Sequence, residues 1–219
     1  MSKPISPKTE GIILNGYSED DYAASYWLEP NVNGERRIDR SANHLIEHLK
    51  TLIERGDMEA DTMVLDIGAG PGNMVNDFMQ AGFAVEGCEY STSGRSLAKK
   101  IFGLDIPACD LRGPIGIPYE SSFFDYAYCV GVLTMIPEQN ISTAISECAR
   151  ILVRGGILLV NLMNPVNVDN EPHITSLPHR EWHRLFKQSD LEDITSILPP
   201  QQFGIGVKNE FCGIFRKRL

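Results

Sequence analysis

Short apolar runs alternate with amphipathic stretches along the chain from about residue 62, and this alternation predicts strand–helix units around a parallel sheet. Residues 157–160, Ile-Leu-Leu-Val, form the continuous apolar run that is typical of a parallel strand buried on both faces. With turn residues as boundaries, the expected strands are 63–67, 84–89, 106–109, 124–130 and 156–162.

Helical periodicity fills the segments between these strands. In 139–151, the apolar residues Ile141, Ala144, Ile145 and Cys148 recur at the spacing that covers a sheet. The expected helices are 39–55, 73–80, 92–102, 139–151 and 177–187, preceded by a short helix from Ser18 to Tyr26. Two final strands at 191–198 and 210–216, expected as an antiparallel pair, complete a seven-stranded sheet. The fold class is therefore α/β, a doubly wound, mostly parallel sheet whose last strand is antiparallel.

Charge and cysteine content limit the partners and the compartment. The net charge is −9, and only Arg36–Arg37 and residues 216–218 are clustered cations, so we expect no nucleic-acid partner. No apolar run reaches the roughly 18 residues that cross a bilayer, and residues 1–11 lack a secretory apolar stretch, so we expect no membrane partner. Five cysteines without a CxxC pair predict free thiols in a reducing compartment, which indicates the cytoplasm.

The most specific motif is Val-Leu-Asp-Ile-Gly-Ala-Gly-Pro-Gly at 64–72, on the first predicted strand-to-helix turn. Glycines at alternate positions let the backbone turn tightly and approach a ligand closely. A dinucleotide-binding turn, GxGxxG, would need its third glycine where Asn73 stands, and Pro71 has no N–H to donate to a pyrophosphate. Asp66 would repel a pyrophosphate but attract a sulfonium or an ammonium. The motif therefore disfavours a nicotinamide cofactor.

Asp66 to Gly72 resembles motif I, acid-x-G-x-G-x-G, of the class I S-adenosylmethionine-dependent methyltransferases. The resemblance covers about residues 60 to 163. Glu89 stands where the family places a carboxylate on the ribose hydroxyls, and Asp110-Leu111 where it places an acid and an amide on adenine. Residues 118–126 resemble the family's lead into strand four. Residues 150–156 are similar to its R-x-L-x-P-G-G segment, with Arg154 in place of the proline. The small-molecule branch, near the ubiquinone-biosynthesis type, is the most similar.

The resemblance implies a Rossmann-like methyltransferase fold that binds S-adenosyl-L-methionine and releases S-adenosyl-L-homocysteine. It implies methyl transfer, by in-line displacement, to an oxygen or nitrogen atom of a small-molecule metabolite. In relatives an N-terminal Tyr or Arg contacts the methionine end, which adds Tyr26 and Arg37 to the candidates. The cofactor-binding residues expected on this basis are Tyr26, Arg37, Asp66, Gly68, Ala69, Gly70, Gly72, Glu89, Tyr90, Asp110, Leu111, Cys129 and Val130.

The chain departs from parts of the family pattern after the fourth strand. Residues 129–133, Cys-Val-Gly-Val-Leu, replace the N/D-P-P-Y/F motif of the enzymes that methylate DNA bases or glutamine. Cys129 lacks the Pro-Cys signature of a cytosine methylase nucleophile, so a free core cysteine is the expected reading. Thr134-Met135 stands where many relatives have a polar pair, and Met135 predicts an apolar wall. Asn164 has no accompanying acid, so no metal is expected.

A single domain, residues 1–219, is expected from the chain length. It divides into an N-terminal helical lid (1–58), the cofactor-binding core (60–163) and a substrate-side loop, helix and last strands (164–219). Residues 172–175 and 180–182 resemble a family segment, H-x-x…W, that borders the substrate pocket. His173 titrates near neutrality and is the candidate general base. His44, His48, His179 and His183 are expected at the surface.

Alternatives to a small-molecule methyltransferase stay open at this stage. The same cofactor site serves protein methyltransferases and partner-binding members of larger assemblies. A nicotinamide-dependent oxidoreductase is the third alternative, disfavoured by Pro71 and Asn73. The expected partner is a small-molecule acceptor, and the expected oligomeric state is a monomer or a homodimer.

Overall fold

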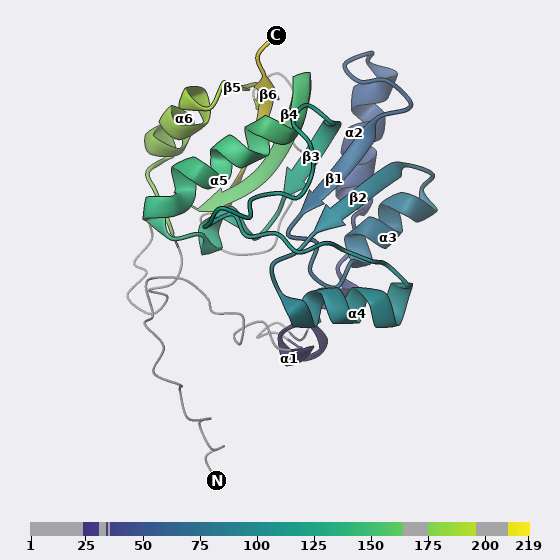
Figure 1. Ribbon diagram of the computed structural model, residues 1–219. Coiled ribbons are helices and arrows are strands. Elements are labelled where there is room, and N and C mark those ends of the chain that lie inside the picture. The colour runs from purple at the N-terminus through teal and green to yellow at the C-terminus, as the bar shows by residue number, and fades with distance from the viewer. Residues whose placement is uncertain (1–23, 31–33, 35, 164–174, 196–209) are drawn as a thin grey trace.

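The computed structural model describes residues 24–30, 34, 36–163, 175–195 and 210–219 (Figure 1). Within them lies one mixed sheet in the order β2-β1-β3-β4-β6-β5. The strands β2, β1, β3 and β4 run parallel, whereas β6 is antiparallel to β4 and β5 is antiparallel to β6. The strand bounds are β1 (Met63–Ile67), β2 (Ala84–Cys88), β3 (Phe124–Cys129), β4 (Leu152–Met163), β5 (Leu191–Asp193) and β6 (Glu210–Lys217). The expected antiparallel pair at the end of the chain is confirmed.

The predicted strand at 106–109 is wrong, so the described sheet has six strands and not seven. Only one parallel bridge forms there, between Glu89 and Ala108. The carbonyl of Pro107 accepts from the Glu89 N–H (3.1 Å), and the Cys109 N–H donates to the Glu89 carbonyl (3.2 Å). Pro107 itself has no N–H for a longer ladder, and the chain turns away at a second bridge, Asp110 with Gly116.

Helices cover both faces of the sheet (Figure 1). The apolar residues of α5 (Glu138–Ile151) and α6 (His179–Gln188) pack on one face, and those of α2 (Asn43–Glu54) and α3 (Asn73–Gln80) on the other. Ala98 of α4 (Thr92–Phe102) packs in a smaller cluster with Ala69 and Val75, next to the first strand-to-helix turn. The short elements are α1 (Ala24–Leu28), η2 (Arg37–Asp39) and η3 (Leu133–Met135). Residues 18–23 of the predicted first helix lie outside the described residues.

The helix predicted at 39–55 begins later, at Asn43, because tertiary contacts hold residues 40–42 outside it. The Asn73 side-chain amide donates to the Arg40 carbonyl (2.6 Å), and the Ala42 N–H donates to the Asp77 carboxylate (2.8 Å). Both partners lie on α3, so α3 fixes the path of residues 40–42. His48 is half-buried rather than at the surface, with its Nδ1 3.1 Å from the Tyr126 hydroxyl, and burial lowers its pKa to about 4.

No helix in the described ranges has both the length and the apolar character to cross a bilayer.

The strands β1, β2 and β3 all end at the same edge of the sheet, at Ile67, Cys88 and Cys129. Ligands of doubly wound sheets bind outside this carboxyl edge, where the loops after the strands converge. The residues that follow these strands therefore form the first place to seek a site.

Candidate functional site

A cavity opens at the carboxyl edge of the sheet and is lined by residues from five parts of the chain. They come from the glycine-rich turn after β1, the turn after β2, the loop after residue 109, the segment after β3, and the N-terminal residues around α1 and η2. The lining residues are Tyr26, Trp27, Arg37, Arg40, Asp66, Ile67, Gly68, Ala69, Gly70, Pro71, Asn73, Met74, Glu89, Tyr90, Cys109, Asp110, Leu111, Arg112, Val130, Gly131, Val132, Met135 and Ile136.

The glycine-rich turn is compact because two of its glycines lie against other side chains. Gly68 (φ +84°) and Gly70 (φ +55°) adopt left-handed backbone angles that favour glycine. A Cβ on Gly68 would collide with Val132, and a Cβ on Gly70 would lie 2.7 Å from the Trp27 ring. The Gly68 and Ala69 N–H groups both donate to the Cys88 carbonyl, which fixes the turn to the end of β2.

Glu89 binds the same turn through its side chain. Its buried carboxylate accepts from the Gly70 N–H (2.7 Å) and from the Ser91 N–H (2.6 Å). Burial raises the pKa of Glu89, and the two backbone donors oppose that rise. A carboxylate has about four acceptor positions, so two remain for further donors. This geometry suits a ligand with two adjacent hydroxyl groups, such as a ribose.

Asp66 contributes a second buried acid, only 4% exposed, at the end of β1. Burial raises its pKa to about 8, the nearby Tyr128 hydroxyl opposes the rise, and repulsion from Glu89 adds to it. A buried carboxylate of this kind gains most from a cationic partner. Two buried acids at this edge fit a positively charged ligand better than a pyrophosphate, because they would repel the phosphates.

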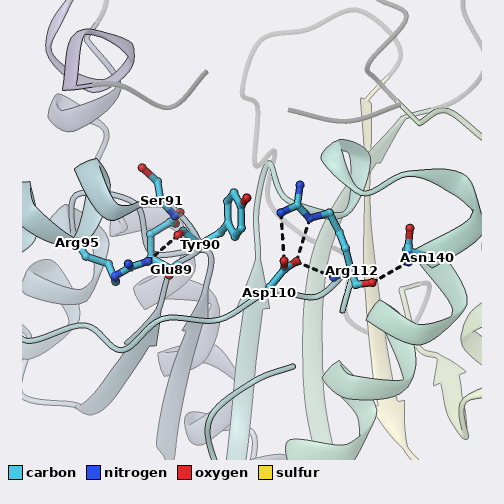
Figure 2. Close-up of polar contacts among 7 residues, drawn as sticks. All are labelled: Glu89, Tyr90, Ser91, Arg95, Asp110, Arg112 and Asn140. Carbon is cyan, nitrogen blue, oxygen red and sulfur yellow. Dashed lines mark hydrogen bonds and ion pairs between the residues drawn. The ribbon is translucent and has the colours of Figure 1, made fainter. Parts of the chain in front are cut away.

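One side of the cavity is lined by Tyr90, Asp110, Leu111 and Arg112. The Arg112 guanidinium forms an ion pair with the Asp110 carboxylate (Nε to Oδ1, 2.9 Å) and lies 4.1 Å above the centre of the Tyr90 ring. Figure 2 shows this arrangement, with Glu89 and Ser91 on the other side of Tyr90. The Leu111 side chain is buried.

Helix α5 fixes the loop that carries Asp110 and Leu111. The Asn140 side-chain amide donates to the Arg112 carbonyl (2.8 Å). The Ile117 N–H donates to the Glu147 carboxylate (3.1 Å), and its carbonyl accepts from Arg150 (2.8 Å). Arg150, the arginine of the R-x-L-x-x-G-G segment, therefore ties α5 to the loop rather than entering the cavity.

The N-terminal segment covers the glycine-rich turn and adds cations to the cavity. Trp27 of α1 packs so closely on Gly70 that the turn has no room for a Cβ at this position. The Arg37 guanidinium lies 3.9 Å above the Tyr26 ring and donates to the Tyr26 carbonyl (3.1 Å). With Arg40, it offers positive charge that suits the carboxylate of an amino-acid ligand.

The segment after β3 forms an apolar wall of Val130, Val132, Met135 and Ile136. The Asn161 side-chain oxygen on β4 accepts from the Gly131 N–H, which fixes the start of this segment. The Thr175 hydroxyl donates to the Ile136 carbonyl (2.6 Å), so the chain after β4 returns against it. Within the described part of the chain, no group of three or more His, Cys, Asp or Glu side chains is placed to hold a metal ion.

Eleven of the thirteen expected cofactor-binding residues line the cavity, and the structure does not bring Gly72 or Cys129 to it. Gly72 caps the start of α3, where a Cβ would meet Leu104 and Ala98 instead. Cys129 is fully buried and its thiol pKa is raised, first by its hydrogen bond with Cys148 and then by burial. His173 lies outside the described residues.

Sequence reasoning missed Trp27, Arg40 and Arg112 as lining residues. Arg112 had a usable signal, since it follows Asp110 by two positions. Trp27 had a partial signal, because it lies in the aromatic-rich N-terminal segment that was expected to cover the site, whereas Arg40 had none, because its place depends on packing against α3.

The sequence model of a methyltransferase-domain family matches residues 65–160, which include the glycine-rich turn, Glu89 and Asp110. This match shows a methyltransferase domain in the central part of the chain, and it agrees with the resemblance of residues 66–72 to motif I of the class I S-adenosylmethionine-dependent methyltransferases. A methyltransferase domain identifies an enzyme of the methyl-transferring type, with S-adenosylmethionine as its cofactor. A sequence search among curated proteins finds no match.

Solved structures of methyltransferases share the fold. A Methanosarcina mazei S-adenosylmethionine-dependent methyltransferase aligns with a TM-score of 0.60 at 17% identity, over 76% of this chain and 97% of that chain. A structure from Thermotoga maritima, described as a possible histamine N-methyltransferase, aligns with a TM-score of 0.55 at 19% identity, over 80% of this chain and 91% of that chain. A Haloferax volcanii methyltransferase in complex with an activator protein aligns with a TM-score of 0.57 at 14% identity, over 81% of this chain and 97% of that chain. At these identities the similarity shows the fold alone.

Proposed function

We propose that the enzyme methylates an oxygen or a nitrogen atom of a small-molecule metabolite with an apolar surface. S-adenosylmethionine supplies an electrophilic methyl group on a sulfonium, which is already a good leaving group. The protein then has to orient the acceptor and exclude water, and it needs a base only where the acceptor atom holds a proton.

In this proposal the cofactor lies along the carboxyl edge of the sheet. Glu89 binds the two ribose hydroxyls, and Tyr90, Asp110 and Leu111 bind adenine. Asp66, Gly68, Ala69 and Gly70 lie along the amino-acid part, with Tyr26 and Arg37 near the methionine end. Arg40 is a second candidate there, because it also lines the cavity.

One observation supports a small acceptor most directly: α1 lies over the cavity, with Trp27 packed on Gly70. A covered cavity accommodates a compact molecule more easily than an extended polypeptide. The wall of Val130, Val132, Met135 and Ile136 offers it apolar contacts, and no charged side chain on this wall would contact a polar acceptor.

Transfer of tritium from methyl-labelled S-adenosylmethionine tests this proposal. The wild-type enzyme is incubated with a cell extract split by size into metabolite and protein fractions, and Glu89→Ala, in which cofactor binding should be weakened, serves as the control with reduced labelling. We expect label in the metabolite fraction alone. Label confined to protein would contradict the proposal and favour a protein methyltransferase.

The other alternative, a methyltransferase that works with a partner protein, has one observation in its favour, the similarity in fold to the Haloferax volcanii methyltransferase in complex with an activator. The proposal also places the enzyme in the cytoplasm, without a nucleic-acid partner, as a monomer or a homodimer. The net charge of −9 and the five free cysteines support this part of it. His173 stays a prediction from the sequence as the general base.

A further inference from the structure

Arg112 contacts both Tyr90 and Asp110, two of the residues that bind adenine in the proposed function. Its guanidinium lies 4.1 Å above the centre of the Tyr90 ring. Its Nε and Nη2 atoms donate to the Asp110 carboxylate at 2.9 and 3.1 Å, and its own N–H also donates to that carboxylate. Figure 2 shows the guanidinium beside the Tyr90 ring and directed at Asp110.

A guanidinium and an adenine ring are chemically similar in the features that matter here. Both are planar, both stack on aromatic rings, and both donate N–H groups to a carboxylate in their own plane. A ring face covered at 4.1 Å by a guanidinium has no room for a purine at stacking distance. Arg112 and adenine therefore compete for that face of Tyr90 and for the acceptors of Asp110.

We propose that the Arg112 side chain occupies the place of adenine in the free enzyme and that S-adenosylmethionine displaces it on binding. The inference rests on the proposed function, because it takes Tyr90 and Asp110 as the adenine contacts. Arg112 thereby sets the affinity for the adenosine part of both cofactor and product, with no direct role in methyl transfer.

The structure allows this exchange without disturbing the loop. The Arg112 carbonyl accepts from Asn140, and Glu147 and Arg150 bind Ile117, so the backbone on both sides stays attached to α5. The Arg112 side chain is 25% exposed, which leaves a route toward solvent. The displacement needs only side-chain rotation.

The loss of binding energy to this competition is modest. A partly exposed cation–π contact and an ion pair of similar exposure are each weak, so the free enzyme gains little from them. The apparent dissociation constant equals the intrinsic one divided by the fraction of molecules in which the site is open. Removing the guanidinium is therefore expected to tighten adenosine binding about 3- to 30-fold, or roughly 0.7 to 2 kcal/mol.

Isothermal titration of the full-length enzyme with S-adenosylhomocysteine and with adenosine tests the proposal. Arg112→Ala is expected to bind both ligands about 3- to 30-fold more tightly than wild type. Arg112→Lys keeps the charge but loses the planar fork and the stacking, so we expect a smaller gain. Lys50→Ala, an exposed charge on α2, is the control for removal of one positive charge and should change neither affinity.

Weaker or unchanged binding by Arg112→Ala would overturn the proposal, since Arg112 would then support adenine or stand apart from it. If Arg112→Ala does not fold, Arg112→Lys takes its place, and binding no tighter than in wild type would again overturn the proposal.

Glu89→Ala distinguishes a failure of the proposed cofactor site from a failure of the proposed displacement of Arg112. Unchanged binding by Glu89→Ala would refute the proposed site itself, whereas weaker binding there without a gain in the Arg112 variants would refute only this inference.

Discussion

The side-chain carboxylate of Glu89 accepts a hydrogen bond from the Gly70 backbone at 2.7 Å, which joins the turn after β1 to the turn after β2. These two turns are separated by almost twenty residues, yet they act as one unit at the carboxyl edge of the sheet. A ribose bound by Glu89 would therefore be fixed relative to the glycine-rich turn.

Replacing Glu89 with alanine should weaken the binding of S-adenosylhomocysteine by about 1–3 kcal/mol, because hydrogen bonds to a charged group are lost. Calorimetric titration measures the effect. Glu86→Ala is the matched control, an exposed acid three residues earlier on β2. Equal losses in both variants would mean that Glu89 has no particular part in binding.

Gly70→Ala should reduce cofactor affinity by tenfold or more, about 1.4 kcal/mol, since the new methyl group would push against Trp27. The matched control is Gly82→Ala. Gly82 has a similarly left-handed φ of +89° but no neighbouring atom within 4 Å, so it shares the backbone strain without the collision. Both variants should lose about 1–2 kcal/mol of stability, measured by urea unfolding. Only Gly70→Ala should bind the cofactor more weakly. Cofactor binding as tight as in wild type would show that Trp27 does not pack closely on the turn.

The raised pKa of Asp66 predicts how stability depends on pH in the absence of cofactor. The pKa is about 8 in the folded protein against 3.8 for an ordinary aspartate. Between these values the unfolded chain binds fewer protons than the folded one, so the free energy of unfolding falls as pH rises. Asp66→Asn should remove this slope and be more stable than wild type at pH 8, on the order of a few kcal/mol. Urea unfolding of both proteins at pH 5 and pH 8 measures the slope and the difference in stability. Parallel pH profiles for the two proteins would contradict a raised pKa at Asp66.

The same residue predicts a proton released on cofactor binding. A cation beside Asp66 favours the charged carboxylate, so S-adenosylmethionine should bind more tightly as pH rises from 6 to 8. Titrations in buffers of different ionisation enthalpy measure the protons released. Asp66→Asn should show weaker binding and lose this part of the pH dependence. If Asp66→Asn shows the same dependence of affinity on pH as wild type, the positive charge of the cofactor does not lie beside Asp66.

His173→Ala tests the base predicted from the sequence. We expect kcat to fall by about 10²- to 10⁴-fold, the contribution typical of general acid–base catalysis, with little change in S-adenosylhomocysteine affinity. Steady-state rates with the acceptor identified by methyl labelling provide the measurement. Full activity would remove His173 from the mechanism.

The central part of the fold could be predicted because its signals are local. The strand β1 and the helices α3 and α4 have the predicted bounds, since apolar runs and turn residues define them. The segment 106–109 looked like a strand by composition, but Pro107 limits its pairing to a single bridge. The start of α2 depends on Asn73 and Asp77, whose contacts with residues 40–42 no local pattern reveals.

The candidate site divides in the same way. Asp66 could be found from the glycine pattern that follows it, Glu89 from the end of a strand, and Asp110 from the resemblance to the family's acid for adenine. Trp27 and Arg40 reach the cavity through long-range packing. The pairing of Arg112 with Tyr90 could not be predicted either, because twenty-one residues of turn and helix separate the two positions along the chain.

The central claim is that an acidic, glycine-rich turn joined to Glu89 holds a cationic nucleoside without phosphates. Side-by-side calorimetric titration of the wild-type enzyme with S-adenosylhomocysteine and with NADH tests it most directly. We predict binding of S-adenosylhomocysteine that Glu89→Ala weakens, and no measurable binding of NADH. Binding of NADH together with no heat from S-adenosylhomocysteine would contradict the account.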